Sequence, residues 1–143
     1  MWPKEYYKDL ANLLVKLGFA VIVVGSSKEK DVGNYIKNGK KEIYNFCGKT
    51  NLTEVAGIIS LTKALISNDS GLMHLAAALK IPQIAIFGST DPEKTGPLNP
   101  KAIVLKKDLP CSPCFKRTCK YGHYKCLRSI SVNEVLKALQ NLF

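Results

Sequence analysis

The sequence lacks features that would place it in several other classes of protein. No apolar run approaches the roughly 18–20 residues that a membrane-spanning helix needs. The first residues lead into an amphipathic segment rather than into the apolar core of a signal peptide. With 46% hydrophobic residues, the chain is also too apolar to be disordered. Its 143 residues therefore predict one soluble globular domain, located in the cytoplasm.

Two common nucleotide-binding motifs are missing as well. Neither the G-x-G-x-x-G fingerprint of dinucleotide-binding folds nor the G-x-x-x-x-G-K-[ST] sequence of a P-loop occurs in the chain. The sequence therefore supports neither a typical dinucleotide fold nor a P-loop enzyme.

Acidic residues are scarce, with 11 Asp and Glu against 21 Lys and Arg, for a net charge of +10. The excess is concentrated in residues 101–128, where eight basic side chains and one acid account for +7 of the charge. The same segment holds four of the five cysteines. An excess of this kind favours an anionic partner such as a nucleotide, a phosphorylated lipid or a nucleic acid.

Helix and strand patterns alternate along the chain. This alternation predicts an α/β fold, a parallel sheet with helices on both faces. The apolar run 19–24 predicts a strand that is covered on both faces, and Thr53 and Ser131 are predicted N-caps. The expected helices are 4–17, 29–37, 53–61, 73–79 and 131–142, and the expected strands are 19–24, 43–46, 64–67, 83–87 and 101–105.

Three polar loops follow predicted strands, at 25–29, 68–71 and 88–97. In parallel sheets, ligands bind beside the loops that leave the carboxyl ends of the strands. These loops are rich in Gly, Ser, Thr or Asp, which suits a nucleotide crevice, although Gly-rich turns also occur for packing reasons alone.

The stretch 67–79, which reads S-N-D-S-G-L-M-H-L-A-A-A-L, is the most specific part of the sequence. Together with I-F-G-S-T-D-P at 86–92, it resembles the C-terminal domain of the ADP-heptose:lipopolysaccharide heptosyltransferases, the glycosyltransferase family 9 proteins of the GT-B fold. Trp2-Pro3, the G-K-T-N-L turn at 48–52 and the cysteine segment 111–126 agree with that family. The resemblance covers nearly the whole chain.

The resemblance implies a Rossmann-like domain that forms the C-terminal half of a GT-B enzyme. Residues 1–143 would be a single nucleotide-sugar-binding domain, with a basic, cysteine-rich segment at 106–128 and a C-terminal helix at 131–142. The family's N-terminal acceptor domain, which carries the catalytic base, would be absent. We therefore expect no catalytic residue in this chain and no activity from it alone.

The motif at 67–79 also has a physical logic of its own. A strand delivers Asp69, Ser70 and Gly71 to the N-terminus of a helix, where unpaired N–H groups and the helix dipole favour a phosphate. Gly71 lets a ligand approach the backbone and Ser70 adds a hydroxyl donor. His74 is able to donate to a phosphate oxygen, whereas Asp69 is better suited to accept hydrogen bonds from sugar hydroxyls.

The family resemblance assigns further contacts. It implies that residues of this motif, Leu72 included, contact the diphosphate and the sugar of the donor. It also implies that Glu29 reaches the ribose. In the loop at 88–97, Thr90 and Asp91 are candidates to line the diphosphate side of the crevice.

Each of these residues also has a plain structural interpretation. Asp69 or Ser70 would serve only as an N-cap, and His74 would be a packed core histidine. Glu29 would belong to a solvated first helical turn, and Thr90 and Asp91 would merely form an Asp-Pro turn.

The cysteine segment leaves its chemistry open. Four thiols within sixteen positions could hold one structural zinc, or they could be free thiols or form a disulfide. Cys47, in a predicted apolar strand, is expected to be inert packing. The four candidate zinc ligands are Cys111, Cys114, Cys119 and Cys126.

The function that follows is donor binding in a glycosyltransferase that moves heptose from ADP-heptose, or a related nucleotide sugar, to the inner core of lipopolysaccharide. That scheme requires no cofactor, and it places the enzyme in the cytoplasm or on the inner face of the membrane. Its partners would be a lipopolysaccharide precursor as acceptor and an N-terminal domain, with no nucleic acid. The alternatives are a non-catalytic nucleotide-binding module and a zinc-knuckle protein that binds nucleic acid.

Overall fold

The computed structural model describes residues 1–88, 92–107 and 124–142. The residues expected to form one domain divide into two compact units. The N-terminal unit is Pro3–Gly57, and the C-terminal unit comprises Met1–Trp2 and Ile58–Phe143. Each unit is built from parallel strands and helices, so the α/β fold class is confirmed.

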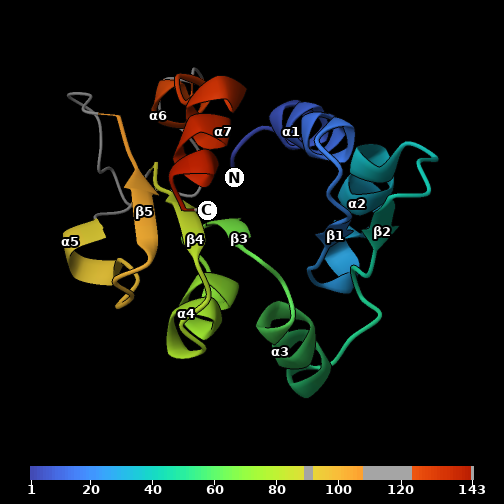
Figure 1. The fold of residues 1–143 in the computed structure, drawn as a ribbon, viewed down its shortest axis with the longest axis horizontal. Helices are drawn as coiled ribbons and strands as arrows, with labels where there is room; N and C mark the ends of the chain where they lie inside the picture. Colours follow the sequence, from blue (N-terminus) through green and yellow to red (C-terminus); the bar gives the residue numbers. More distant parts are fainter. Residues whose placement is uncertain (89–91, 108–123, 143) are drawn as a thin grey trace. The chain divides into compact units, whose positions relative to one another are not determined.

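The N-terminal unit is a two-stranded parallel sheet with two helices packed on it. Strand β1 (Val21–Val23) pairs with β2 (Ile43–Asn45), with Val21 opposite Ile43. Both α1 and α2 lie on the same face of this sheet (Figure 1). Ala11, Ile36 and Ile43 form the buried core between them. The helices of this unit are α1 (Lys4–Lys16), α2 (Lys30–Lys37) and the first part of α3 (Leu52–Ser60), and the 3-10 turn η1 (Ser27–Glu29) precedes α2.

One face of this sheet is more open than the sequence predicted. Ile22, in the middle of β1, is 38% exposed, and its neighbour Tyr44 on β2 is 47% exposed. Successive side chains of a strand point to opposite faces, so α1 and α2 bury Ile43 and Asn45 while Ile22 and Tyr44 lie on the other face. The prediction of a strand covered on both faces is therefore wrong for β1.

The cap of α3 also differs from the prediction. The side chain of Asn51 accepts a hydrogen bond from the N–H of Glu54 at 2.8 Å, and the N–H of Asn51 donates to the Glu54 carboxylate at 3.0 Å. This reciprocal pair is a capping box. The helix consequently begins at Leu52, and Thr53, the predicted N-cap, lies inside its first turn.

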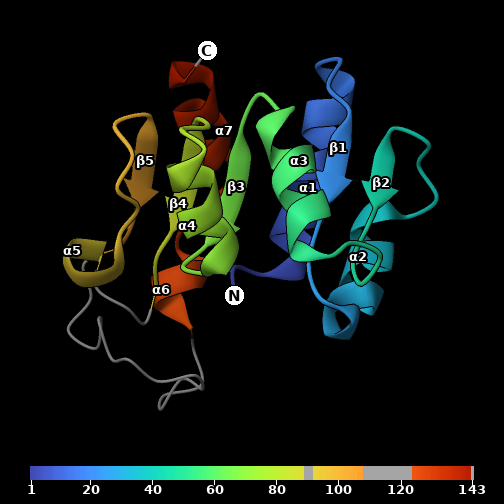
Figure 2. The same ribbon diagram turned by 90° about the horizontal axis from the view of Figure 1, so that it is seen from below.

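The C-terminal unit is a three-stranded parallel sheet in the order β3-β4-β5. Figure 2 shows α4 and α7 on opposite faces of it, and both helices contact β4. This is the predicted arrangement of helices on both faces. The elements are β3 (Leu65–Asn68), α4 (Gly71–Ala78), β4 (Gln83–Ile86), α5 (Pro92–Thr95), β5 (Ala102–Leu105), α6 (Lys125–Arg128) and α7 (Val132–Asn141).

The core of this unit surrounds β4, every residue of which is buried. Trp2 is fully buried in the same unit, and its indole N–H donates to the carbonyl of Ile130 at 2.9 Å. Ser131 and Glu134 form a capping box at the start of α7, so the predicted N-cap there is confirmed. The first residues of the chain are thus anchored next to its last helix.

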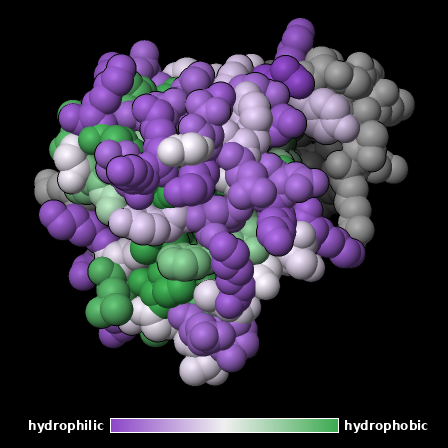
Figure 3. Space-filling view, turned by 90° about the vertical axis from the view of Figure 1, so that its right-hand side faces the viewer, coloured by the Kyte–Doolittle hydropathy of each residue, from purple (hydrophilic) through white to green (hydrophobic). Residues whose placement is uncertain are grey.

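The surface is mainly polar where Figure 3 shows it. Hydrophilic side chains cover most of the face that α2 and β2 present there. Within the described ranges, no helix has the length and apolar character needed to cross a membrane.

Candidate functional site

The carboxyl ends of β3 and β4 bring two of the predicted loops to one edge of the C-terminal sheet. The strands are parallel, and Asn68 at the end of β3 is in register with Ile86 at the end of β4. Asp69 and Ser70 therefore follow β3 at the same edge where Phe87 and Gly88 follow β4. This edge is where ligands bind in parallel α/β sheets.

The turn after β3 leads directly into the N-terminus of α4. Ser70 occupies the N-cap position with an extended backbone (φ −156°, ψ 171°), and its hydroxyl makes no hydrogen bond to the described first turn of α4. The first N–H groups of a helix, here from Gly71 to Met73, have no partner inside it. Both Ser70 and Gly71 are exposed, whereas Asp69 is half-buried. The start of the helix, where N–H groups lack intrahelical partners and the dipole is positive, is therefore exposed at Ser70 and Gly71, which suits an anion.

Gly71 is a glycine that no contact within the described residues requires. A Cβ added at this position would meet no described atom within 4 Å, and the backbone is not in the left-handed region. Alanine would satisfy the helix better than glycine. The absence of a side chain at Gly71 thus leaves the helix end open for a ligand.

The side chains that follow Gly71 separate into exposed and buried positions. His74, one turn inside α4, is exposed, so it is not a packed core histidine. Met73 is fully buried and packs against Ala85 and Phe87, while Leu72 is half-buried. The exposed face of α4 therefore presents the His74 imidazole near the N-terminus of the helix, and the buried face packs the helix on the sheet.

Glu29 lies in the N-terminal unit, at the end of η1 and after the carboxyl end of β1. The hydroxyl of Ser26 donates to its carboxylate at 3.4 Å. A Cβ added at Gly25 would overlap the same carboxylate, which is therefore folded back over the backbone of Gly25. Glu29 is exposed, but its carboxylate accepts a hydrogen bond from Ser26, unlike the side chain of a freely solvated helical turn.

The negative charge of Glu29 affects two groups that the sequence did not connect with it, the hydroxyl of the partly buried Tyr7 and the thiol of the buried Cys47. Burial raises the pKa of the Tyr7 hydroxyl on α1, and the negative charge of Glu29 raises it further. Burial also raises the pKa of the Cys47 thiol, again with a contribution from Glu29. Tyr7 and Cys47 are distant from Glu29 in sequence, so only the folded unit brings their environments together.

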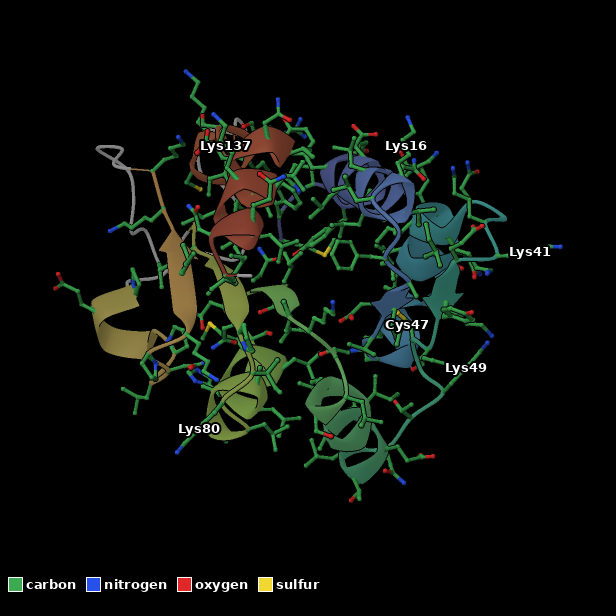
Figure 4. The ribbon with its side chains drawn as sticks, in the orientation of Figure 1. Lys16, Lys41, Cys47, Lys49, Lys80 and Lys137 are labelled. Carbon is green, nitrogen blue, oxygen red and sulfur yellow. The ribbon has the colours of Figure 1, made fainter. Side chains whose placement is uncertain are left out.

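Cys47 is buried as expected, but it follows β2 instead of lying within a strand. Figure 4 shows it in the interior of its unit, whereas Lys16, Lys41 and Lys49 point away from the ribbon. Its raised pKa keeps the thiol protonated, and protonated thiols are poor nucleophiles. The interpretation of Cys47 as inert packing is consistent with this position.

The turn after β4 is in close contact with α6. A Cβ added at Gly88 would lie 2.7 Å from Cγ of Leu127 and 3.2 Å from Sγ of Cys126. Cys126 is therefore next to the edge of the sheet where Asp69 and Ser70 lie.

The other candidates at this edge and in the cysteine segment lie outside the described residues, namely Thr90, Asp91, Cys111, Cys114 and Cys119. Within the described part of the chain, no three His, Cys, Asp or Glu side chains come together as a metal site would require. The zinc hypothesis and the roles of Thr90 and Asp91 stay predictions.

Comparison with known proteins identifies relatives across the chain. The profile of glycosyltransferase family 9 (heptosyltransferase) matches residues 1–125. The chain is 43% identical over 110 residues to lipooligosaccharide heptosyltransferase 2 of Haemophilus influenzae, covering 73% of this chain and 32% of that protein. It is 35% identical over 146 residues to lipopolysaccharide heptosyltransferase 2 of Salmonella typhimurium, covering 99% and 42%. The chain thus spans less than half the length of these curated relatives.

Solved structures show the same similarity in three dimensions. The Escherichia coli ADP-heptose lipopolysaccharide heptosyltransferase II matches with a TM-score of 0.85 and 34% identity, over 99% of this chain and 41% of that one. The Escherichia coli heptosyltransferase WaaC with ADP matches with a TM-score of 0.79 and 25% identity, over 99% and 40%.

Proposed function

This chain belongs to glycosyltransferase family 9, and we propose that it binds the nucleotide-sugar donor of a heptosyltransferase. The single observation that carries this proposal is the open N-terminus of α4. A Cβ at its glycine would meet no described atom within 4 Å, its N-cap hydroxyl is unused by the described first turn, and an imidazole lies exposed one turn away. These are the features expected where a diphosphate binds.

The diphosphate is the part of the donor that α4 would hold. Each favourable interaction of an anion with a helix N-terminus contributes about 0.3–1 kcal/mol, and hydrogen bonds to a charged phosphate contribute about 1.5–3 kcal/mol. Ser70, Gly71 and His74 together would supply such bonds through a hydroxyl, backbone N–H groups and a ring N–H. Leu72 would add a backbone donor, and Asp69 would accept a hydrogen bond from the sugar.

The ribose is assigned to Glu29. A carboxylate accepts two hydroxyl hydrogen bonds at once, which suits the vicinal diol of a ribose. The carboxylate is held by Ser26 while remaining exposed. A solved relative has ADP bound, and we assign the same nucleotide to this chain.

In the reaction, this chain would position the donor and stabilise the departing diphosphate as the bond to the anomeric carbon breaks. The heptose would pass from ADP-heptose to the inner core of lipopolysaccharide. The names of the relatives give ADP-heptose, heptose transfer and lipopolysaccharide for their own reactions. The acceptor, a lipopolysaccharide precursor, and the catalytic base would be held by an N-terminal domain, and no cofactor would be needed. An enzyme with such an acceptor would work on the inner face of the cytoplasmic membrane.

Titration calorimetry with ADP and with ADP-heptose tests the proposal. We expect both ligands to bind the 143-residue chain with dissociation constants below about 1 mM, since a diphosphate held by several charged hydrogen bonds gains several kcal/mol. A folded chain that gives no binding signal at millimolar concentrations of either ligand would contradict donor binding. If ADP binds but no transfer occurs when an N-terminal domain is supplied, the chain is a nucleotide-binding module and not half of an enzyme.

A further inference from the structure

Two turns of the N-terminal unit are joined by their backbones where β1 and β2 end. The N–H of Phe46 donates to the carbonyl of Val23, and the N–H of Gly48 donates to the carbonyl of Gly25, both at 2.9 Å. The ladder of the sheet therefore continues past the strands into the turn that carries Glu29. The two turns cannot move independently without breaking these hydrogen bonds.

Gly48 brings the turns closer than any other residue could. Its φ is +73°, in the left-handed region, and a Cβ added to it would lie 2.8 Å from Cα of Ser27 and 3.1 Å from its Cβ. Ser27 is the first residue of η1, the turn that ends at Glu29. The atoms in contact belong to the backbone or lie next to it, so they cannot rotate away as a side-chain tip can.

Gly25 makes room for the carboxylate itself. A Cβ there would overlap the carboxylate oxygen of Glu29, so the observed position of the carboxylate requires glycine. In this case the atom in contact is the far end of a flexible side chain. A methyl group at Gly25 would displace the carboxylate while leaving the backbone in place.

We propose that Gly25 and Gly48 are positioning residues for Glu29, and that through it they set the preference of the site for a ribose over a deoxyribose nucleotide. Gly48 holds the backbone of the turn, and Gly25 admits the carboxylate over it. This inference rests on the proposed binding of a nucleotide. It adds that the selectivity for the sugar depends on two residues that do not themselves touch it.

The test compares binding of ADP and of 2′-deoxy-ADP to the 143-residue chain and its variants by titration calorimetry. The unmodified chain should prefer ADP by about tenfold or more, because a hydrogen bond to a charged acceptor is lost with the 2′-hydroxyl. Gly25→Ala and Gly48→Ala should each reduce that preference to within about twofold of unity, because the carboxylate no longer meets the hydroxyl. Gly25→Ala should keep the fold, so it can be measured even if Gly48→Ala cannot.

Gly39→Ala is the matched control. Gly39 has the same φ of +73° in the same unit, but a Cβ there would meet no described atom within 4 Å. Its alanine variant therefore has the same backbone strain without contact with the turn of Glu29. It should retain the full preference for ADP even if its thermal stability falls.

A second measurement separates the failure of this inference from the failure of the proposed function. The amide resonances of residues 26–29, recorded by NMR without ligand, should shift in Gly48→Ala and Gly25→Ala and stay in place in Gly39→Ala. If the unmodified chain binds no ADP, the proposed function fails, while unchanged resonances in both variants would overturn the positioning role. Binding of ADP with no preference over 2′-deoxy-ADP, or a preference that both variants retain, would overturn the inference alone.

Discussion

Two turns with candidate ligand-binding residues, one in each compact unit, use glycine in opposite ways. A Cβ added at Gly71, at the start of α4, would meet no described atom within 4 Å, whereas one added at Gly25 or at Gly48 would meet the turn that ends at Glu29. The first glycine leaves room for something outside the protein, and the other two leave room for the protein itself. Replacing Gly71 should therefore change ligand binding alone. Replacing Gly25 or Gly48 should move a group of the protein, the Glu29 carboxylate or the turn that carries it, and change binding through that movement.

Gly48→Ala should have the largest effect on stability. An alanine with left-handed φ costs about 1–2 kcal/mol, and an overpacked contact adds about 1–3 kcal/mol. Chemical denaturation should therefore show a loss of about 2–5 kcal/mol in the free energy of unfolding, against about 1–2 kcal/mol for Gly39→Ala. Equal losses in the two variants would mean that the contact with Ser27 has no energetic role.

Gly71→Ala should weaken ligand binding without lowering stability, in contrast with Gly48→Ala. The free energy of unfolding should stay within about 1 kcal/mol or rise, because alanine has the better helix propensity. The affinity for ADP should fall by about tenfold or more, because the methyl group occupies the space that a phosphate oxygen would enter.

Gly57→Ala in α3 is the control for that experiment. It is also a helical glycine whose added Cβ would meet no described atom within 4 Å. It should gain about 0.5–1 kcal/mol in stability and leave the affinity for ADP unchanged. If Gly71→Ala behaves in the same way, the N-terminus of α4 does not hold the diphosphate.

His74→Gln should have a moderate effect confined to binding. The exposed imidazole can be replaced without disturbing the core, so the melting temperature should stay the same. Losing one hydrogen bond to a phosphate should weaken ADP binding by about three- to tenfold, which calorimetry can measure. A fall in melting temperature without a change in affinity would assign His74 a structural role.

Replacing Glu134 should have the smallest effect on stability. The carboxylate of Glu134 is paired with a cation, Lys107, whereas that of Glu29 accepts a hydrogen bond from the hydroxyl of Ser26. Lys107 Nζ lies 3.0 and 2.9 Å from its two oxygens, and this hydrogen bond, with those from Ser131, lowers the pKa of Glu134. A lowered pKa in the folded state stabilises the protein above the pKa of the unfolded chain, and that contribution is lost as the pH falls through the folded value.

Both partners of this ion pair are more than a third exposed. Glu134→Gln should therefore cost only about 0.5 kcal/mol at neutral pH, and the difference from the unmodified chain should vanish in acid. Chemical unfolding curves of both proteins, recorded at several pH values, measure this difference in the free energy of unfolding. A difference that persists below the pKa of the folded state would mean that the charge of Glu134 is not its source.

Local patterns predicted much of the molecule. The alternation of helices and strands, the cap at Ser131 and the helix that follows Asp69 and Ser70 depend on residues close together in the chain, so they could be read from spacing. The predicted cap at Thr53 was wrong because Asn51 and Glu54 form a competing capping box two residues earlier. Ile22 was placed in a strand correctly, but its exposure depends on which face the helices cover.

The sequence by itself determined the α/β class, the family and the helix that begins at Gly71, because hydrogen bonds within helices and turns join near neighbours. Only the tertiary structure decided what surrounds Glu29. The hydrogen bond from Gly48 to Gly25, and the effect of the Glu29 charge on the pKa values of Tyr7 and Cys47, join residues that are close only when α1, β1 and β2 pack together. Packing also distinguished the glycine that leaves space for a ligand from the two that leave space for the chain.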